Sequence, residues 1–121
     1  MKVLLVDDDA FLRDMYATKF IECGHEVEVV GDSKIAFAKI KEGNFDAVML
    51  DVIMPGLSGL ELLKDIKESG VSKDSKYIVL SNQSESSDKA AAEEFGADGY
   101  IVKAESIPSD VVKKVEEICK K

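Results

Sequence analysis

Carboxylates follow two apolar runs of this chain. The run at residues 3–6 leads directly into Asp7 and Asp8, and the run at residues 45–50 leads into Asp51. A carboxylate in apolar surroundings is costly unless it is paired, coordinated or used chemically. Hard cations such as Mg²⁺ prefer carboxylate oxygens as ligands. We therefore expect Asp7, Asp8 and Asp51 to form one cation site, if both runs end at the same edge of a sheet.

Two further polar side chains follow later apolar runs. Ser81 comes directly after residues 76–80, and Lys103 comes directly after residues 99–102. A carboxylate can attack phosphorus as a nucleophile and form an acyl phosphate. Phosphoryl transfer also needs a metal ion and groups that neutralise the phosphoryl oxygens. Asp51 is therefore the candidate nucleophile, and Ser81 and Lys103 are candidate partners of the phosphoryl oxygens.

These residues are positioned by short β-like runs that alternate with helical segments. Three of the β-like runs are apolar without alternation, which is typical of strands covered on both faces in a parallel sheet. The run at residues 26–30 alternates and is expected at a sheet edge. The expected strands are residues 2–6, 26–30, 45–50, 76–80 and 99–102, and the expected helices are residues 10–23, 33–42, 57–69, 85–95 and a last one beginning near Pro108.

Five successive βα units predict a parallel sheet with helices on both faces. Right-handed crossovers favour the flavodoxin-like (βα)5 fold, with strand order 2-1-3-4-5. In such sheets the functional crevice lies beyond the carboxyl ends of the strands, where all five candidate side chains fall. The length of 121 residues predicts a single domain spanning residues 1–121.

Net charge and the distribution of apolar residues limit the kinds of partner and the cellular location expected for this protein. The net charge of −8 argues against direct binding of nucleic acid, which needs a basic face. No apolar stretch approaches the roughly 18 residues of a membrane span, and no signal peptide is recognisable, so a cytoplasmic protein without membrane contact is expected. Cys23 and Cys119 are expected to be free thiols. His25, the only histidine, is expected to face solvent in a turn far from the candidate site.

Four motifs give the chain a family resemblance. They are VLLVDDD at residues 3–9, LDVIMPGLSG at 50–59, VLSN at 79–82 and GADGYIVK at 96–103. With them the chain resembles the receiver domain of bacterial two-component response regulators, in particular single-domain, chemotaxis-regulator-like proteins, over essentially its full length. The resemblance implies a signalling switch, not a classical enzyme, in which Asp51 accepts a phosphoryl group from a sensor histidine kinase or a phosphotransfer protein.

The resemblance also implies residue roles. It assigns Ser81 and Lys103 to the phosphoryl oxygens, and Tyr100 to a switch in which its side chain turns inward as Ser81 moves. The face made by the fourth helix, fifth strand and fifth helix would then change for an unknown output protein, in a monomer or a phosphorylation-dependent dimer. The implied ligands of Mg²⁺, with Mn²⁺ as the alternative cation, are Asp7, Asp8, Asp51 and the backbone carbonyl of Ile53.

The chain departs from the family pattern in three places. Ala104 follows Lys103 where the family often has proline, so we expect either a trans peptide or a strained cis peptide there. The reach of Lys103 toward Asp51 is therefore the least constrained part of the site. Asn82 replaces a small residue, and Ile53 offers no group to orient a hydrolytic water, although Gln83 is an alternative. We expect slow self-dephosphorylation.

Three other interpretations remain open at this point. A Mg²⁺-dependent aspartyl phosphohydrolase would want a second acid at position 53 and a cap domain. An FMN-binding electron carrier of the same fold would want a phosphate loop after the first strand, where residues 7–9 are acidic and would repel phosphate. The chain can also be a receiver domain cut from a multidomain DNA-binding regulator.

Overall fold

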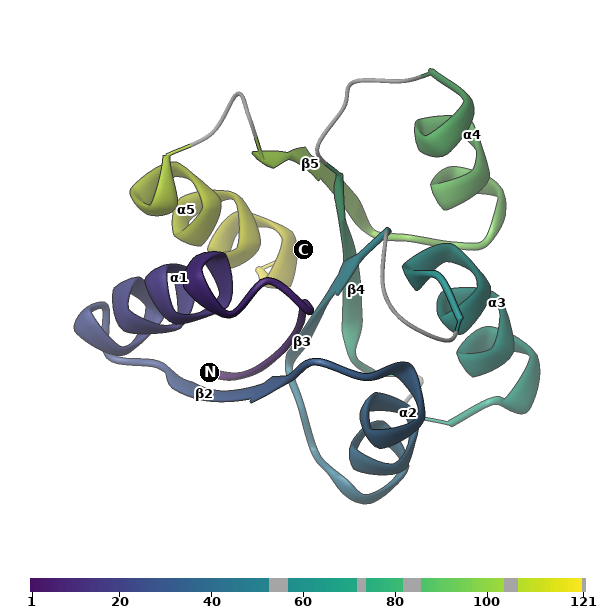
Figure 1. Cartoon of the computed structure of the whole chain (residues 1–121), viewed down its shortest axis with the longest axis horizontal. Helices are drawn as coiled ribbons and strands as arrows, with labels where there is room; N and C mark the ends of the chain where they lie inside the picture. Colours follow the sequence, from purple (N-terminus) through teal and green to yellow (C-terminus); the bar gives the residue numbers. More distant parts are fainter. Residues whose placement is uncertain (53–56, 72–73, 82–85, 104–106, 121) are drawn as a thin grey trace.

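Strands and helices alternate along the whole chain in the computed structural model, which describes residues 1–52, 57–71, 74–81, 86–103 and 107–120 (Figure 1). This alternation confirms the predicted succession of βα units. The elements are β1 (Lys2–Val6), α1 (Ala10–Glu22), β2 (Glu26–Val30), α2 (Ser33–Glu42), β3 (Ala47–Asp51), α3 (Gly59–Ser69), β4 (Lys76–Ser81), α4 (Ser86–Glu94), β5 (Gly99–Val102) and α5 (Pro108–Cys119).

The strands form one parallel sheet in the order β2-β1-β3-β4-β5, as predicted. Figure 1 shows α1 and α5 on one face of the sheet and α2, α3 and α4 on the other. Alternate residues of each central strand therefore enter different cores. Leu4 and Val6 pack with residues of α2 and α3, whereas Val3 and Leu5 pack with residues of α1 and α5. The two layers hold the strand ends in fixed register.

Polar side chains set the starts of the helices. Asp9 accepts a hydrogen bond from the Leu12 backbone N–H and caps α1. Asp32 caps α2 in the same way. Ser58 caps α3, so this helix begins at Gly59, two residues later than expected.

The central strands extend further toward their carboxyl ends than expected. The predicted strand at 45–50 instead starts at Ala47 and includes Asp51, and β4 includes Ser81. The reason is a continued ladder, because Asp51 is paired with Leu80 and the Val52 N–H donates to the Leu80 carbonyl at 3.0 Å. Asp51 and Ser81 are thus held by the sheet and not by loops.

The prediction that His25 faces solvent, at the opposite end of the sheet, is wrong. His25 lies far from the candidate site as expected, but its side chain is only 13% exposed and does not face solvent. Its Nε2 lies 2.8 Å from a Glu116 carboxylate oxygen, and its Nδ1 lies 3.2 Å from the amino group of Met1. The contact with α5 was missed because the two residues are 91 positions apart. The position of His25 in a turn gives no indication of a partner on a distant helix.

The remaining surface prediction concerns the two cysteines. Cys23 is exposed and Cys119 half-buried, and both thiols are free. Lys113, Lys114 and Lys120, on or next to α5, are exposed. Within the described ranges, no helix has the length and apolar character needed to cross a membrane.

Candidate functional site

Asp7 is anchored at the carboxyl end of β1. Its backbone N–H donates to the Val30 carbonyl at 3.0 Å, which continues the pairing of β1 with β2. The side chain is completely buried, and one carboxylate oxygen accepts a hydrogen bond from the Asp9 N–H at 2.9 Å. The carboxylate is therefore fixed in direction by the backbone that follows it.

Asp51 ends β3 beside Asp7 and is 4% exposed. Its backbone runs against the start of α3, where the Gly59 N–H donates to the Val52 carbonyl at 3.0 Å. A Cβ atom at position 59 would overlap the Asp51 carbonyl oxygen. Glycine is therefore required for α3 to approach this closely. Sequence reasoning did not assign this role to Gly59, and its only signal was the glycine at the helix start.

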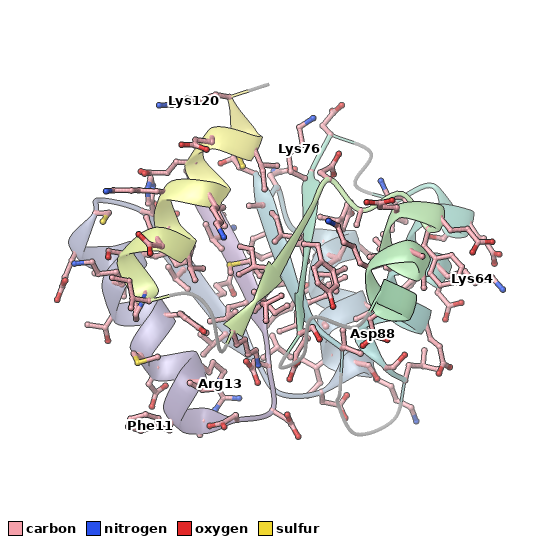
Figure 2. All side chains as sticks on the ribbon, turned by 90° about the horizontal axis from the view of Figure 1, so that it is seen from above. Phe11, Arg13, Lys64, Lys76, Asp88 and Lys120 are labelled. Atoms are coloured by element: carbon pink, nitrogen blue, oxygen red, sulfur yellow. The ribbon has the colours of Figure 1, made fainter. Side chains whose placement is uncertain are left out.

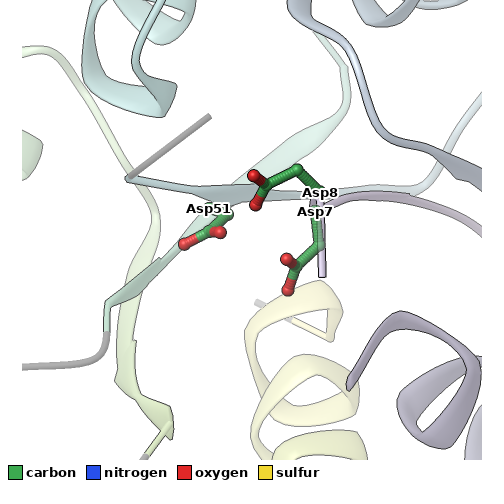
Figure 3. A group of neighbouring side chains, drawn as sticks. All are labelled: Asp7, Asp8 and Asp51. Carbon is green, nitrogen blue, oxygen red and sulfur yellow. The ribbon is translucent and has the colours of Figure 1, made fainter. Parts of the chain in front are cut away.

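Three carboxylates converge between the ends of β1 and β3. Oxygens of Asp7, Asp8 and Asp51 all lie within 4.8 Å of one another, as predicted (Figure 3). Asp7 and Asp51 are buried, whereas Asp8 is exposed, so the group is open to solvent on one side. Cluster geometry and ligand type both suit a hard divalent cation.

Lys103 brings a positive charge to the same place from the end of β5. Its ammonium nitrogen lies 2.6 Å from an Asp7 carboxylate oxygen and 3.4 Å from an Asp51 carboxylate oxygen. The lysine side chain is 4% exposed. The structure thus brings Lys103 within contact distance of Asp51, although the Lys103–Ala104 peptide itself lies outside the described residues.

One lysine does not neutralise the buried carboxylates. Burial raises the pKa of Asp51 from its ordinary 3.8 to about 6, with the Lys103 ammonium opposing the rise and the Asp7 carboxylate adding to it. Burial works against the charged form of Lys103, but its two carboxylate partners raise the pKa of that ammonium overall. The excess negative charge that remains is the environment in which a divalent cation binds well.

Ser81 and Tyr100 stand on the two strands beyond Asp51. Ser81 is buried at the end of β4 and is paired with Val102 of β5. Tyr100 is half-buried in β5 and packs against the core beneath α2, α3 and α4. The other predicted participants, Ile53, Asn82, Gln83 and Ala104, lie outside the described residues.

Tyr16 is a further neighbour of the site that sequence reasoning did not assign to it. This side chain of α1 is 1% exposed, and burial raises the pKa of its hydroxyl. The charges of Lys103, Asp7 and Asp51 all act on that hydroxyl. A tyrosine at an apolar position of the helix was the one available signal.

Comparison with known proteins places this arrangement in a family. Residues 3–116 match the family model described as the response regulator receiver domain. The two-component response regulator PhoP of Pseudomonas aeruginosa is 35% identical over 103 residues, which are 85% of this chain and 45% of that protein. The transcriptional regulatory protein ResD of Bacillus subtilis is 32% identical over 99% of this chain and 48% of its own length.

A solved structure agrees over the whole fold. The receiver domain of the Francisella response regulator 1452 superposes with a TM-score of 0.90 at 30% identity, covering 98% of this chain and 96% of that one. The chain spans about half the length of the curated relatives it matches. Receiver domains are in general signalling phosphoacceptors and not classical enzymes. This chain belongs to the family of response regulator receiver domains.

Proposed function

We propose that the chain is a phosphorylation-dependent signalling switch with Asp51 as its phosphoacceptor. The observation that carries the proposal is the position of the Asp51 carboxylate. It lies within 4.8 Å of two further carboxylates and 3.4 Å from the Lys103 ammonium. A nucleophile, a cation site and a fixed positive charge are the parts that phosphoryl transfer requires. The domain spans residues 1–121 in this proposal.

The cation is Mg²⁺, with Mn²⁺ as a substitute, held by Asp7, Asp8, Asp51 and the backbone carbonyl of Ile53. Support comes from the donor set, because three carboxylates with one lysine leave a net negative charge. The response regulator TrrA of Thermotoga maritima, 34% identical over 97% of both chains with a TM-score of 0.83, was solved in complex with Mg²⁺-BeF. When bound, the cation neutralises charge on the transferring phosphoryl group.

The chain's own residues perform the remaining steps. An Asp51 carboxylate oxygen attacks phosphorus, so that a P–O bond forms while the P–N bond of the donor phosphohistidine breaks and the electron pair leaves with the imidazole. Lys103 then contacts a phosphoryl oxygen, and the Ser81 hydroxyl donates to another. Ionisation of Asp51 favours the attack, and with its pKa at about 6 the carboxylate is largely ionised at neutral pH.

The signal leaves the site through Ser81 and Tyr100. Phosphorylation adds close to two negative charges and new acceptor oxygens at the end of β3. As Ser81 moves toward them, Tyr100 turns inward and alters the face made by α4, β5 and α5. In this proposal the protein is cytoplasmic and acts as a monomer or a phosphorylation-dependent dimer. Its partners are a sensor histidine kinase or a phosphotransfer protein and an output protein.

The strongest alternative is a receiver domain that belongs to a longer DNA-binding regulator. Relatives about twice the length of this chain, named as transcriptional regulatory proteins, favour it. The phosphotransfer chemistry at Asp51 is the same in both cases, and nucleic acid is not a direct partner of the receiver domain itself.

Intact-mass measurement after treatment with acetyl phosphate and Mg²⁺ tests the proposal. We expect a gain of one phosphoryl group that is lost in Asp51→Asn and in the presence of EDTA. Asp14→Asn, which removes an exposed acid of α1, is the matched control and should be labelled normally. Equal labelling of the Asp51→Asn variant, or no labelling of the unmodified protein, would refute Asp51 as the phosphoacceptor.

The lifetime of the phosphorylated form is a second expectation. No side chain at position 53 can orient a hydrolytic water, because this residue is isoleucine, so we expect slow self-dephosphorylation. The decay of the phosphorylated mass in Mg²⁺ measures it directly. A half-life of seconds would contradict the expectation without affecting the assignment of Asp51.

A further inference from the structure

Arg13 is placed unfavourably in the first turns of α1. Within the described ranges, its Nε is the one buried side-chain nitrogen or oxygen without a hydrogen-bond partner, and no carboxylate there forms an ion pair with it. A cation near the start of a helix also opposes the helix dipole. A side chain that costs stability in two ways is typical of a functional position.

The contact that Arg13 does make is with the cation site. Its Nη1 donates to the backbone carbonyl of Asp7 at 3.3 Å. This carbonyl belongs to the peptide that joins Asp7 to Asp8. Because the orientation of that peptide sets the directions of both neighbouring carboxylates, a hydrogen bond to it acts on two of the three acids in the cluster. Figure 2 shows Arg13 near the end of the molecule opposite Lys76 and Lys120.

Gly31 leaves the space that the guanidinium needs. A Cβ atom there would lie 2.8 Å from the Arg13 Nη1, 3.7 Å from the Asp7 carbonyl oxygen and 3.9 Å from the Asp8 Cα. Gly31 follows β2, so the guanidinium lies between the turn after β2 and the acidic end of β1. A methyl group at position 31 would push the flexible tip of Arg13 away from the carbonyl.

We propose that Arg13 is a positioning residue for the divalent cation, acting through the Asp7–Asp8 peptide. The inference rests on the proposed function of this cluster as a cation site. Residues that orient metal ligands typically contribute ten- to a hundredfold to metal affinity, and the long 3.3 Å bond places Arg13 at about tenfold. Charge repulsion alone predicts the opposite change in metal affinity, because removing the positive charge of Arg13 near the cluster would favour cation binding.

Titration of the unphosphorylated protein with MgCl₂, followed by ¹H–¹⁵N NMR, measures the affinity without any phosphodonor. We expect Arg13→Gln to raise the dissociation constant about tenfold. Gly31→Ala should raise it similarly while keeping the charge, and the double variant should show no further loss, because both changes remove one contact. Lys19→Gln is the matched control, since it removes a surface cation of the same helix.

The possible results distinguish a failure of the Arg13 inference from a failure of the proposed cation site. Unchanged or tighter Mg²⁺ binding in either Arg13→Gln or Gly31→Ala, or fully additive losses in the double variant, would overturn the inference. Unfolding midpoints in EDTA show whether each variant is folded, and Gly31→Ala carries the test alone if Arg13→Gln is not. Absence of Mg²⁺ binding in the unmodified protein would instead refute the cation site in the proposed function.

Discussion

Asp51→Asn should make the protein more stable in the absence of a divalent cation. The Asp51 carboxylate is buried, and burial raises its pKa from 3.8 to about 6, so the folded state holds the ionised form at a cost. That pKa difference corresponds to about 3 kcal/mol once the carboxylate is ionised. The pKa of about 6 already includes the opposing attraction of Lys103, and the amide removes the charge while leaving Lys103 with Asp7 at 2.6 Å. We therefore expect a gain of up to about 3 kcal/mol.

The pH dependence fixes the sign of this effect. A folded-state pKa above the unfolded value means that the folded protein binds the proton more tightly, so stability falls as the pH rises from 3.8 toward about 6. The loss of folding free energy caused by ionised Asp51 is complete above about pH 6 and small below pH 3.8. The advantage of Asp51→Asn should therefore be largest at about pH 7.5 and shrink to about a third at about pH 4.5.

Urea denaturation in EDTA at both pH values measures the difference, with Asp14→Asn as the control. Adding Mg²⁺ should narrow the gap, because the cation stabilises only the folded form that binds it. A variant no more stable than the unmodified protein at about pH 7.5, or an advantage that grows on acidification, would refute the reasoning about buried charge.

Two other substitutions test the same geometry. Lys103→Met should destabilise the folded protein by about 3 kcal/mol in EDTA, because Asp7 would keep a buried charge without its partner; an unchanged urea midpoint would contradict this. Gly59→Ala should cost about 1–3 kcal/mol and also weaken Mg²⁺ binding, because the new methyl group would push α3 away from the Asp51 carbonyl. If Gly59→Ala is less stable but binds Mg²⁺ normally, the approach of α3 to Asp51 does not affect the cation site and this part of the prediction is wrong.

The strand order and the location of the site were predictable because both follow from the sequence pattern. Apolar runs separated by helices favour few parallel arrangements, and the residues after those runs must share one edge. Asp51 and Ser81 are accordingly neighbours in the sheet, although each lies inside its strand and not after it. Pattern reasoning thus placed the elements correctly and erred only by one or two residues at their bounds.

Contacts between distant side chains were not predictable in the same way. The pairing of Lys103 with Asp7 joins residues 96 positions apart, and its distance depends on the backbone after β5. The His25–Glu116 contact and the approach of Gly59 to Asp51 depend likewise on how helices pack on the sheet. A sequence indicates which residue types reach a region, whereas packing decides which atoms meet.

The excess negative charge of the site links the folding cost of the buried Asp51 carboxylate to its proposed use. One ammonium is shared between two buried carboxylates and lies closer to Asp7 than to Asp51, so Asp51 is left the less neutralised of the two. Burial of this incompletely neutralised carboxylate raises the Asp51 pKa, with the Asp7 carboxylate adding to the rise, and so costs folding free energy. The same excess of negative charge favours a divalent cation. A better-neutralised cluster would fold more stably but bind Mg²⁺ less well. The folding cost of the buried Asp51 carboxylate is therefore the expected consequence of keeping this group available for the proposed metal binding and phosphoryl transfer.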